Sequence, residues 1–294
     1  MAATLPALRL TLPERRQGRA PDDALRARRQ ETGFADPEKV AKLPLIGGVP
    51  CVIVGNENAP RVILHLHGGG FRLGFAAGWA GFARRLADKA DAKVIVPEYA
   101  LAPERPFPAA IYDTLAILAE LFETSGGSPV FLSGDSAGGG VALSAAVALA
   151  DARRLAGLIL LSPWIDVRVQ AESYSRCATT DAWFSHAAAS ASASDYLQGW
   201  SADDPLASPL LADPGGLPAT CIIASTSEVL ADDSIELARS LATHDVPVSL
   251  LMRPGLPHDW PVVTPDAAES DHALGIIADF VMSELSATTA SLEK

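Results

Sequence analysis

The feature that most constrains this chain is a Gly-x-Ser-x-Gly segment set between a short apolar run and a long Ala-rich stretch. The segment is Gly134-Asp135-Ser136-Ala137-Gly138, flanked by residues 129–132 and 140–150. These flanks predict a buried strand and a buried helix. A turn this sharp strains the serine backbone, so the neighbouring residues must be small. The N-terminus of the helix directs free N–H groups toward the serine. The pattern predicts a nucleophilic Ser136, although a Gly-rich turn with an incidental serine fits the segment taken alone.

Apolar runs alternate with stretches of helical spacing along most of the chain. Strands are expected at residues 49–54, 61–66, 93–97, 129–132, 158–161, 221–224 and 246–252. Helices are expected at about residues 74–90, 111–122, 140–150, 230–243 and 274–285. Strands that alternate with helices predict the α/β class, with a mostly parallel sheet covered by helices on both faces. We expect the strand at 49–54 to be an edge strand.

Two parts of the chain interrupt this alternation. Residues 1–45 have little strand character, and residues 166–205 are rich in Ala, Ser and aromatic side chains. We expect residues 46–294 to form the main domain, with a cap built from residues 1–45 and from the insert at about 166–205.

The N-terminal part contains signals for one helix. Pro21-Asp22-Asp23 can begin a helix and Gly33 can end it. The alternative for residues 1–20 is a disordered tail.

A nucleophilic serine needs a base and an acid that orients the base. His258 lies in the loop directly after the last expected strand, and Glu228 is the first carboxylate after the strand at 221–224. An open α/β sheet places its site at these strand ends. His258 is therefore the candidate base and Glu228 the candidate acid. Asp232 and Asp233 are rivals for the acid, although their place at a helix start also suits the helix dipole.

The other histidines are weaker candidates for the base. His65 lies within an expected strand, where a buried, hydrogen-bonded role is expected. His186, His244 and His272 lie in expected helices or at their ends, where we expect them to face solvent.

A glycine triplet follows the strand at 61–66, in the segment His67-Gly68-Gly69-Gly70. Glycines allow backbone N–H groups to approach a substrate oxygen closely, so this segment is expected to supply an oxyanion hole together with the N–H of Ala137. A plain loop or a phosphate-binding nest is the alternative for a glycine triplet. The Lys-Ser/Thr pair of a P-loop does not follow, which weakens the phosphate interpretation.

Composition limits the partners and the compartment. A formal charge of −12 disfavours nucleic acid, and no apolar run approaches the roughly 20 residues of a membrane span. The chain has 3 cysteines without metal-ligand spacing, so no metal site is expected. Few, unpaired cysteines and the lack of a secretory signal pattern favour a cytoplasmic protein.

Several motifs together resemble the hormone-sensitive lipase family of α/β-hydrolases, in its bacterial carboxylesterase branch. They occupy residues 67–71, 99–104, 134–139, 162–164, 208–211 and 255–258, and the resemblance runs from about residue 45 to the C-terminus. The resemblance implies an α/β-hydrolase catalytic domain with a helical cap. It further implies the triad Ser136, Glu228 and His258, and an oxyanion hole formed by the N–H groups of Gly68, Gly69 and Ala137. Short-chain acyl esters as substrates, no cofactor and association as a homodimer are also implied.

These features together predict a serine carboxylesterase that works through an acyl-enzyme. The alternatives are a lactone, amide or carbamate hydrolase or an acyltransferase with the same triad. A further alternative is a small-molecule binding protein, as in the plant gibberellin receptor, which is similar to this family but lacks the catalytic His. Aromatic side chains are expected to line the substrate pocket, and the candidates are Phe71, Trp164, Trp183, Phe184, Trp200 and Trp260.

Overall fold

The computed structural model describes residues 5–33 and 36–292, which fold around an eight-stranded sheet of order β1-β2-β4-β3-β5-β6-β7-β8. The parallel strands are β3 (Val62–Leu66), β4 (Lys93–Pro97), β5 (Val130–Asp135), β6 (Gly157–Leu161), β7 (Thr220–Ser225) and β8 (Val248–Arg253). The short β1 (Leu45–Ile46) and β2 (Val49–Val54) are antiparallel and complete one edge. The expected α/β class with a mostly parallel sheet is confirmed.

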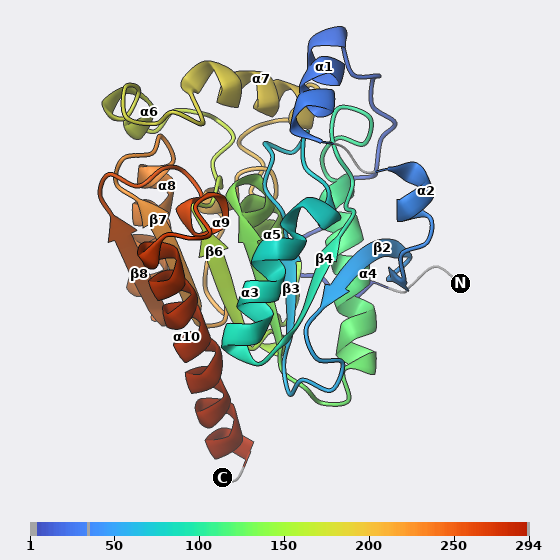
Figure 1. Ribbon diagram of the computed structural model, residues 1–294, viewed down its shortest axis with the longest axis vertical. Coiled ribbons are helices and arrows are strands. Elements are labelled where there is room, and N and C mark those ends of the chain that lie inside the picture. Colours follow the sequence, from blue (N-terminus) through green and yellow to red (C-terminus); the bar gives the residue numbers. More distant parts are fainter. Residues whose placement is uncertain (1–4, 34–35, 293–294) are drawn as a thin grey trace.

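Helices cover both faces of the sheet, which explains why every residue of β3, β5, β6 and β7 is buried (Figure 1). One face packs against α4 (Ala109–Thr124), α5 (Ser136–Ala148) and α8 (Ala231–Thr243). The other face packs against α3 (Ala80–Ala90) and α10 (Ala268–Leu292). Successive strand residues alternate between the two cores: Leu132 belongs to the first and Phe131 to the second.

The expected elements differ from the observed ones in two places. β2 is not the edge strand, because the two-residue β1 pairs outside it, with Ile46 opposite Val49. The helix expected at 74–90 is divided into a 3₁₀ turn, η1 (Ala76–Trp79), and α3. Short 3₁₀ turns also occur at η2 (Ala152–Arg154) and η3 (Pro209–Leu211).

The N-terminal segment lies against the main domain. Leu8 forms an isolated bridge with Leu149, and Nε of Arg9 donates to the carbonyl of Val147 at 2.6 Å. The expected helix is present as α1 (Asp23–Thr32), where the Asp22 side chain accepts from the N–H of the third residue and Gly33 follows the last turn. The short α2 (Pro37–Val40) follows.

The insert after β6 contains α6 (Ser173–Arg176) and α7 (His186–Leu197), which lie with α1 beyond one end of the sheet (Figure 1). Arg19 pairs with Asp195 of α7, and Nη2 of Arg16 donates to the carbonyl of Leu197 at 2.8 Å. The two segments expected to form the cap therefore touch each other.

α1 is tied down by a buried arginine. Nη1 of Arg29 lies 2.6 Å from Oε1 of Glu104, and its Nε and Nη2 donate to the carbonyls of Arg72 and Ala102, both at 2.9 Å. These contacts join the N-terminal segment to the loops that follow β3 and β4.

Candidate active site

Ser136 lies at the junction of β5 and α5 in a left-handed backbone conformation, with φ of 49°. Such a conformation is strained for a residue with a side chain and is typical of functional positions. The absence of a side chain at Gly138 allows the neighbouring chain to approach this turn closely, because a Cβ there would overlap the carbonyl of Leu66. The free N–H groups of the first turn of α5 consequently lie next to the serine.

His258 reaches Ser136 from a loop between β8 and the short helix α9 (Trp260–Val263). Its Nε2 lies 2.9 Å from Oγ of Ser136, and its Nδ1 lies 2.5 Å from Oε2 of Glu228. The three side chains follow β5, β7 and β8, whose carboxyl ends meet at one edge of the sheet. The structure therefore brings together the three candidate residues that the sequence indicated.

Glu228 is fully buried and is held by several donors. Its Oε1 accepts from the N–H of Ser225 at 2.7 Å and from Oγ of Ser162 at 3.0 Å. These bonds direct Oε2 toward the imidazole. The arrangement fixes the tautomer with the proton on Nδ1, which leaves Nε2 free to accept the hydroxyl proton of Ser136.

The two rival carboxylates are engaged elsewhere. Asp232 pairs with Arg176 and accepts from the N–H of Ser173 at 2.8 Å. Asp233 accepts from the N–H groups of residues 165 and 166, at 2.9 and 3.1 Å. Both serve to anchor the start of the 166–205 insert.

A further carboxylate, not anticipated from the sequence, contacts the base. Oδ2 of Asp259 lies 3.1 Å from Nε2 of His258. Burial disfavours the imidazolium, but the charges of Asp259 and Glu228 outweigh it and hold the pKa of His258 well above its ordinary value. The adjacency of an acid to the candidate base was the one signal in the sequence that could have indicated this contact.

The structure corrects the expected set of oxyanion donors. The N–H of Gly68 donates to Oδ2 of Asp135 at 3.0 Å, so it is not available to a substrate. No protein acceptor within the described residues takes the N–H of Gly69 or Gly70. Ala137 lies in the first turn of α5, where N–H groups have no partner within the helix. The free donors therefore belong to Gly69, Gly70 and Ala137.

A buried network holds the glycine loop beside the serine. Asp135 accepts from Gly68, and its Oδ1 lies 3.1 Å from Nε2 of His65. Nδ1 of His65 in turn lies 2.9 Å from Oγ of Ser133. Tyr99 adds a 2.6 Å bond from its hydroxyl to the carbonyl of His67. The buried, hydrogen-bonded environment expected for His65 is confirmed.

The aromatic side chains expected to line the pocket have different environments. Trp164 is fully buried and packs on the ring of Phe71 at 5.0 Å, while Phe71 stacks on Tyr196 at 3.9 Å. Both side chains are buried and pack against each other, so neither presents an exposed surface. Phe184 of the insert lies closer to the chemistry, with its ring stacked 5.9 Å from that of His258.

Two other side chains of this set have different environments. Trp183 is 64% exposed and lies outside the packed aromatic group. Trp260 is fully buried in the core between the sheet, α3 and α10, although it lies only two residues after His258. The chain turns between the two residues through Asp259, whose φ is 55°, and this turn sends the indole away from the site.

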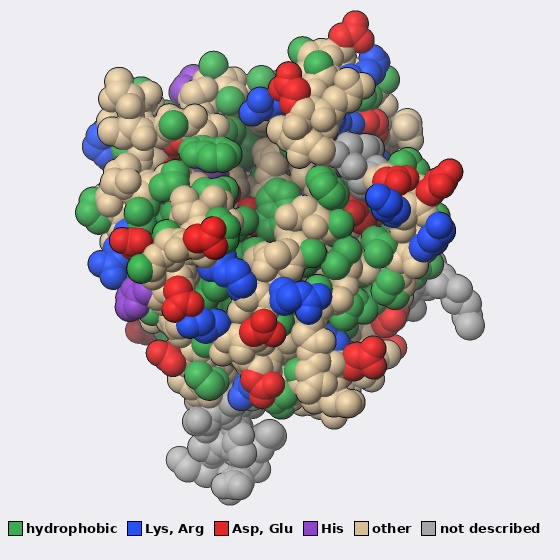
Figure 2. Space-filling model, viewed as in Figure 1, with side chains coloured by type: hydrophobic (Ala, Val, Ile, Leu, Met, Phe, Trp, Pro, Cys, Tyr) green, Lys and Arg blue, Asp and Glu red, His purple; other side chains and the backbone are tan. Residues whose placement is uncertain are grey.

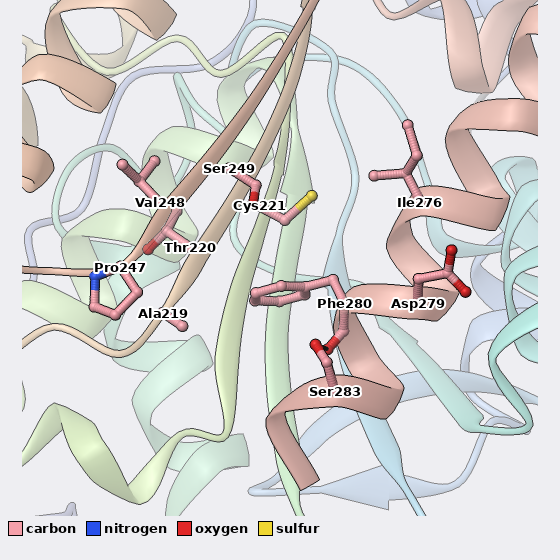
Figure 3. Close-up of a pocket in the computed structure, with 10 residues that line it drawn as sticks. All are labelled: Ala219, Thr220, Cys221, Pro247, Val248, Ser249, Ile276, Asp279, Phe280 and Ser283. Atoms are coloured by element: carbon pink, nitrogen blue, oxygen red, sulfur yellow. Dashed lines mark hydrogen bonds between the residues drawn. The ribbon is translucent and has the colours of Figure 1, made fainter. Parts of the chain in front are cut away.

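Two surface cavities lie away from these residues. One, of about 400 Å³, lies between the first residues of β7 and β8 and the side chains of α10 (Figure 3). It is at the opposite end of the strands from Ser136, Glu228 and His258. The other, of about 720 Å³, is lined by charged side chains of the insert and α8, including Arg168, Arg176 and Asp232.

The grouping of metal-binding side chains, the character of the helices and the distribution of surface charge are the remaining features of the described residues. Within residues 5–33 and 36–292, no three His, Cys, Asp or Glu side chains are grouped as a metal site would require. None of the helices described there combines the length and the apolar character needed to cross a bilayer. Acidic and basic side chains are interspersed, not separated by sign, over the face shown in Figure 2.

The fold and this constellation together define an α/β-hydrolase. A protein family described as having the alpha/beta hydrolase fold matches residues 63–262. The chain is 34% identical over 226 residues to an acetyl-hydrolase of Streptomyces hygroscopicus, covering 75% of each chain. It is 33% identical over 236 residues to an esterase of Acinetobacter venetianus, covering 79% of this chain and 78% of the relative.

Solved structures agree with these relatives. An esterase from the bacterial hormone-sensitive lipase family superposes with a TM-score of 0.79 at 30% identity, over 90% of this chain and 93% of that one. An esterase/lipase from an uncultured bacterium superposes with a TM-score of 0.79 at 28% identity, over 91% and 92% of the two chains. The chain belongs to the hormone-sensitive lipase family of α/β-hydrolases.

Proposed function

We propose that this protein is a serine carboxylesterase that hydrolyses short-chain acyl esters through an acyl-enzyme on Ser136. Family membership makes it a carboxylic ester hydrolase. The observation that carries the serine mechanism is the hydrogen-bonded series from Oγ of Ser136 through His258 to Glu228, at 2.9 and 2.5 Å.

The proposed reaction begins with attack of Oγ of Ser136 on the ester carbonyl carbon. Nε2 of His258 accepts the hydroxyl proton as the new C–O bond forms, and the buried carboxylate of Glu228 stabilises the imidazolium. His258 then donates this proton to the leaving alcohol as the ester bond breaks. Water repeats the sequence on the acyl-enzyme, which releases the acid and restores the serine. These steps need no cofactor.

The negative charge that develops on the carbonyl oxygen requires donors already in place. We assign this role to the N–H groups of Gly69, Gly70 and Ala137. Loss of one oxyanion donor costs about 3 kcal/mol in a comparable serine hydrolase. The bond between Gly68 and Asp135 supports this assignment because it fixes the loop and leaves the next two amides unpaired.

The preference for short acyl chains is supported by the bulk of the side chains around the triad. Phe184 covers one face of the imidazole, and Phe71, Trp164 and Tyr196 pack together behind it. One of the similar proteins is named an acetyl-hydrolase. We further propose that α1, α6 and α7 form the cap that closes over the ester.

Hydrolysis of p-nitrophenyl esters of increasing acyl length tests this proposal. We expect kcat/KM to be highest for the acetyl to butyryl esters and to fall for longer chains. Equal or greater rates with long-chain esters would contradict the short-chain preference. Lactones, amides and carbamates measured alongside would reveal the alternative reactions of the same triad. The binding-protein alternative is disfavoured because His258 is present and contacts Ser136.

We further propose that the protein is cytoplasmic and forms a homodimer. The thiols of Cys51, Cys177 and Cys221 are all free and buried, which suits a reducing compartment and supports a cytoplasmic location. Association as a homodimer is suggested by the family resemblance, and sedimentation analysis would test it.

A further inference from the structure

Asp259 places a buried carboxylate on the nitrogen that must act as the base. The residue is 7% exposed, and its Oδ2 lies 3.1 Å from Nε2 of His258. The same Nε2 lies 2.9 Å from Oγ of Ser136. Oδ1 of Asp259 has no hydrogen-bond partner among the described residues. Nε2 therefore has two neighbouring oxygens, of which only one belongs to the nucleophile.

The position of this carboxylate is fixed by the backbone. The N–H of Asp259 donates to Oγ of Ser162 at 3.2 Å, and its carbonyl accepts from the N–H groups of Val262 and Val263 at 2.8 and 3.0 Å. Its left-handed φ of 55° turns the chain directly after His258. The contact with the imidazole is thus built into the loop.

The ring must carry an additional proton for this contact to be favourable. When Nδ1 of a neutral His258 carries the proton and donates it to Glu228, Nε2 presents only a lone pair. A lone pair and an ionised carboxylate 3.1 Å apart repel each other. If Nε2 carries an additional proton, the imidazolium and the carboxylate form a buried ion pair. That proton prevents Nε2 from accepting the proton of Ser136.

We propose that Asp259 is a positioning residue that retains a proton on Nε2 of His258 and thereby sets the acid limit of the esterase activity. The inference rests on the proposed function, in which His258 is the base. At low pH the imidazolium is held between Glu228 and Asp259, and Ser136 is not activated. As the pH rises, the retained proton leaves, and Nε2 can then accept a hydrogen bond from the hydroxyl of Ser136.

The other charged groups around this pair act in a consistent direction. Glu228 contacts the ring from the loop after β7. Asp135 lies at the end of β5, is bonded to His65, and acts through its charge on Asp259. Burial raises the pKa of Asp259 to about 7, His258 opposes this rise, and the charges of Asp135 and Glu228 add to it. Glu228 and Asp259 therefore flank the imidazole directly, and both favour retention of a proton on it.

The experiment compares pH profiles of kcat/KM for p-nitrophenyl acetate in wild type, Asp259→Asn and Asp259→Gly. Asn keeps the shape of the side chain and tolerates the left-handed conformation, and Gly accepts that conformation without any side chain. Removal of a charge in contact with an imidazolium lowers its pKa by roughly 1–3. We expect the midpoint of the acid limb to move down by about one pH unit or more in both variants, whatever their maximal rates.

Asp91→Asn is the matched control. Asp91 also has a left-handed conformation, with φ of 45°, but it follows α3 and its side chain is 69% exposed beside Arg61. This variant removes the same charge from a similar backbone and should leave the acid limb in place. An acid limb that stays at the wild-type pH in both Asp259 variants would overturn the inference.

Nitrogen NMR of the resting wild-type protein gives a test that does not depend on turnover. Nε2 of His258 should be protonated at pH 6.5, where a free imidazole is about half protonated, and should lose its proton only at higher pH. In Asp259→Asn the same signal should titrate at lower pH. A wild-type Nε2 that is already unprotonated at pH 6.5 would refute the inference. Full activity of Ser136→Ala would instead refute the proposed function, so the two failures are distinguishable.

Discussion

Oγ of Ser162 donates a 3.0 Å hydrogen bond to Oε1 of Glu228, and this bond links the end of β6 to the proposed acid. The same hydroxyl accepts from the N–H of Asp259 at 3.2 Å. One buried serine thus joins the loop that carries the acid to the loop that carries the base. We expect it to fix the distance between Glu228 and His258.

Ser162→Ala should therefore lower kcat without a comparable change in KM. A hydrogen bond to a charged group contributes about 1.5–3 kcal/mol, which corresponds to a decrease of roughly 10–100-fold. Steady-state kinetics with p-nitrophenyl acetate measures this effect. An unchanged kcat in a folded variant would show that Ser225 alone holds Glu228.

The acid is distinguished from its rival by a pair of isosteric variants. Glu228→Gln removes the charge opposite Nδ1 of His258 and should lower kcat by about 10³–10⁴, as in other serine triads. Asp232→Asn is the control, because Asp232 pairs with Arg176 and anchors the insert. Asp232 contacts neither His258 nor Ser136, so this variant should change kcat by less than about threefold. The reverse order would assign the acid to Asp232.

The Asp135–Gly68 bond predicts an effect on the oxyanion loop. Asp135→Ala leaves the N–H of Gly68 and the ring of His65 without their acceptor, so the loop should lose its fixed position. We expect kcat to fall by about 10²–10³, the cost of a lost oxyanion donor. Asp135→Asn retains an acceptor for Gly68 and should recover most of the activity. Equal losses in both variants would assign the effect to the charge of Asp135 instead of to the loop.

Trp164 and Trp183 should differ in their effect on stability. Trp164→Ala removes a fully buried ring packed on Phe71 and should lower the free energy of unfolding by about 3–5 kcal/mol. Trp183→Ala changes a side chain that is 64% exposed and should alter it by about 0.5 kcal/mol or less. Denaturant unfolding measures both. Similar losses in the two variants would contradict the packing described above.

The sequence predicted most of the sheet and the residues that the site brings together, because each of these residues follows an apolar run. A strand pattern reveals its own carboxyl end, and parallel strands place those ends at one edge. Ser136, Glu228 and His258 could be found in this way without knowledge of any contact. β1 could not, because two residues are too few for a periodic pattern.

The remaining features depend on contacts between distant segments. Gly68 and Gly70 are indistinguishable in sequence, and only the side chain of Asp135 determines which amide is free. Trp260 lies beside the candidate base in sequence, but the left-handed turn at Asp259 sends it into the opposite core. No local pattern encodes either result.

The most direct test of the central claim is covalent labelling with a fluorophosphonate followed by peptide mass spectrometry. The serine mechanism predicts one adduct, on Ser136, in the wild-type protein. Labelling should be absent in Ser136→Ala and strongly slowed in His258→Ala, in parallel with esterase activity. Undiminished labelling or esterase activity in folded Ser136→Ala would contradict the assignment of Ser136 as the nucleophile.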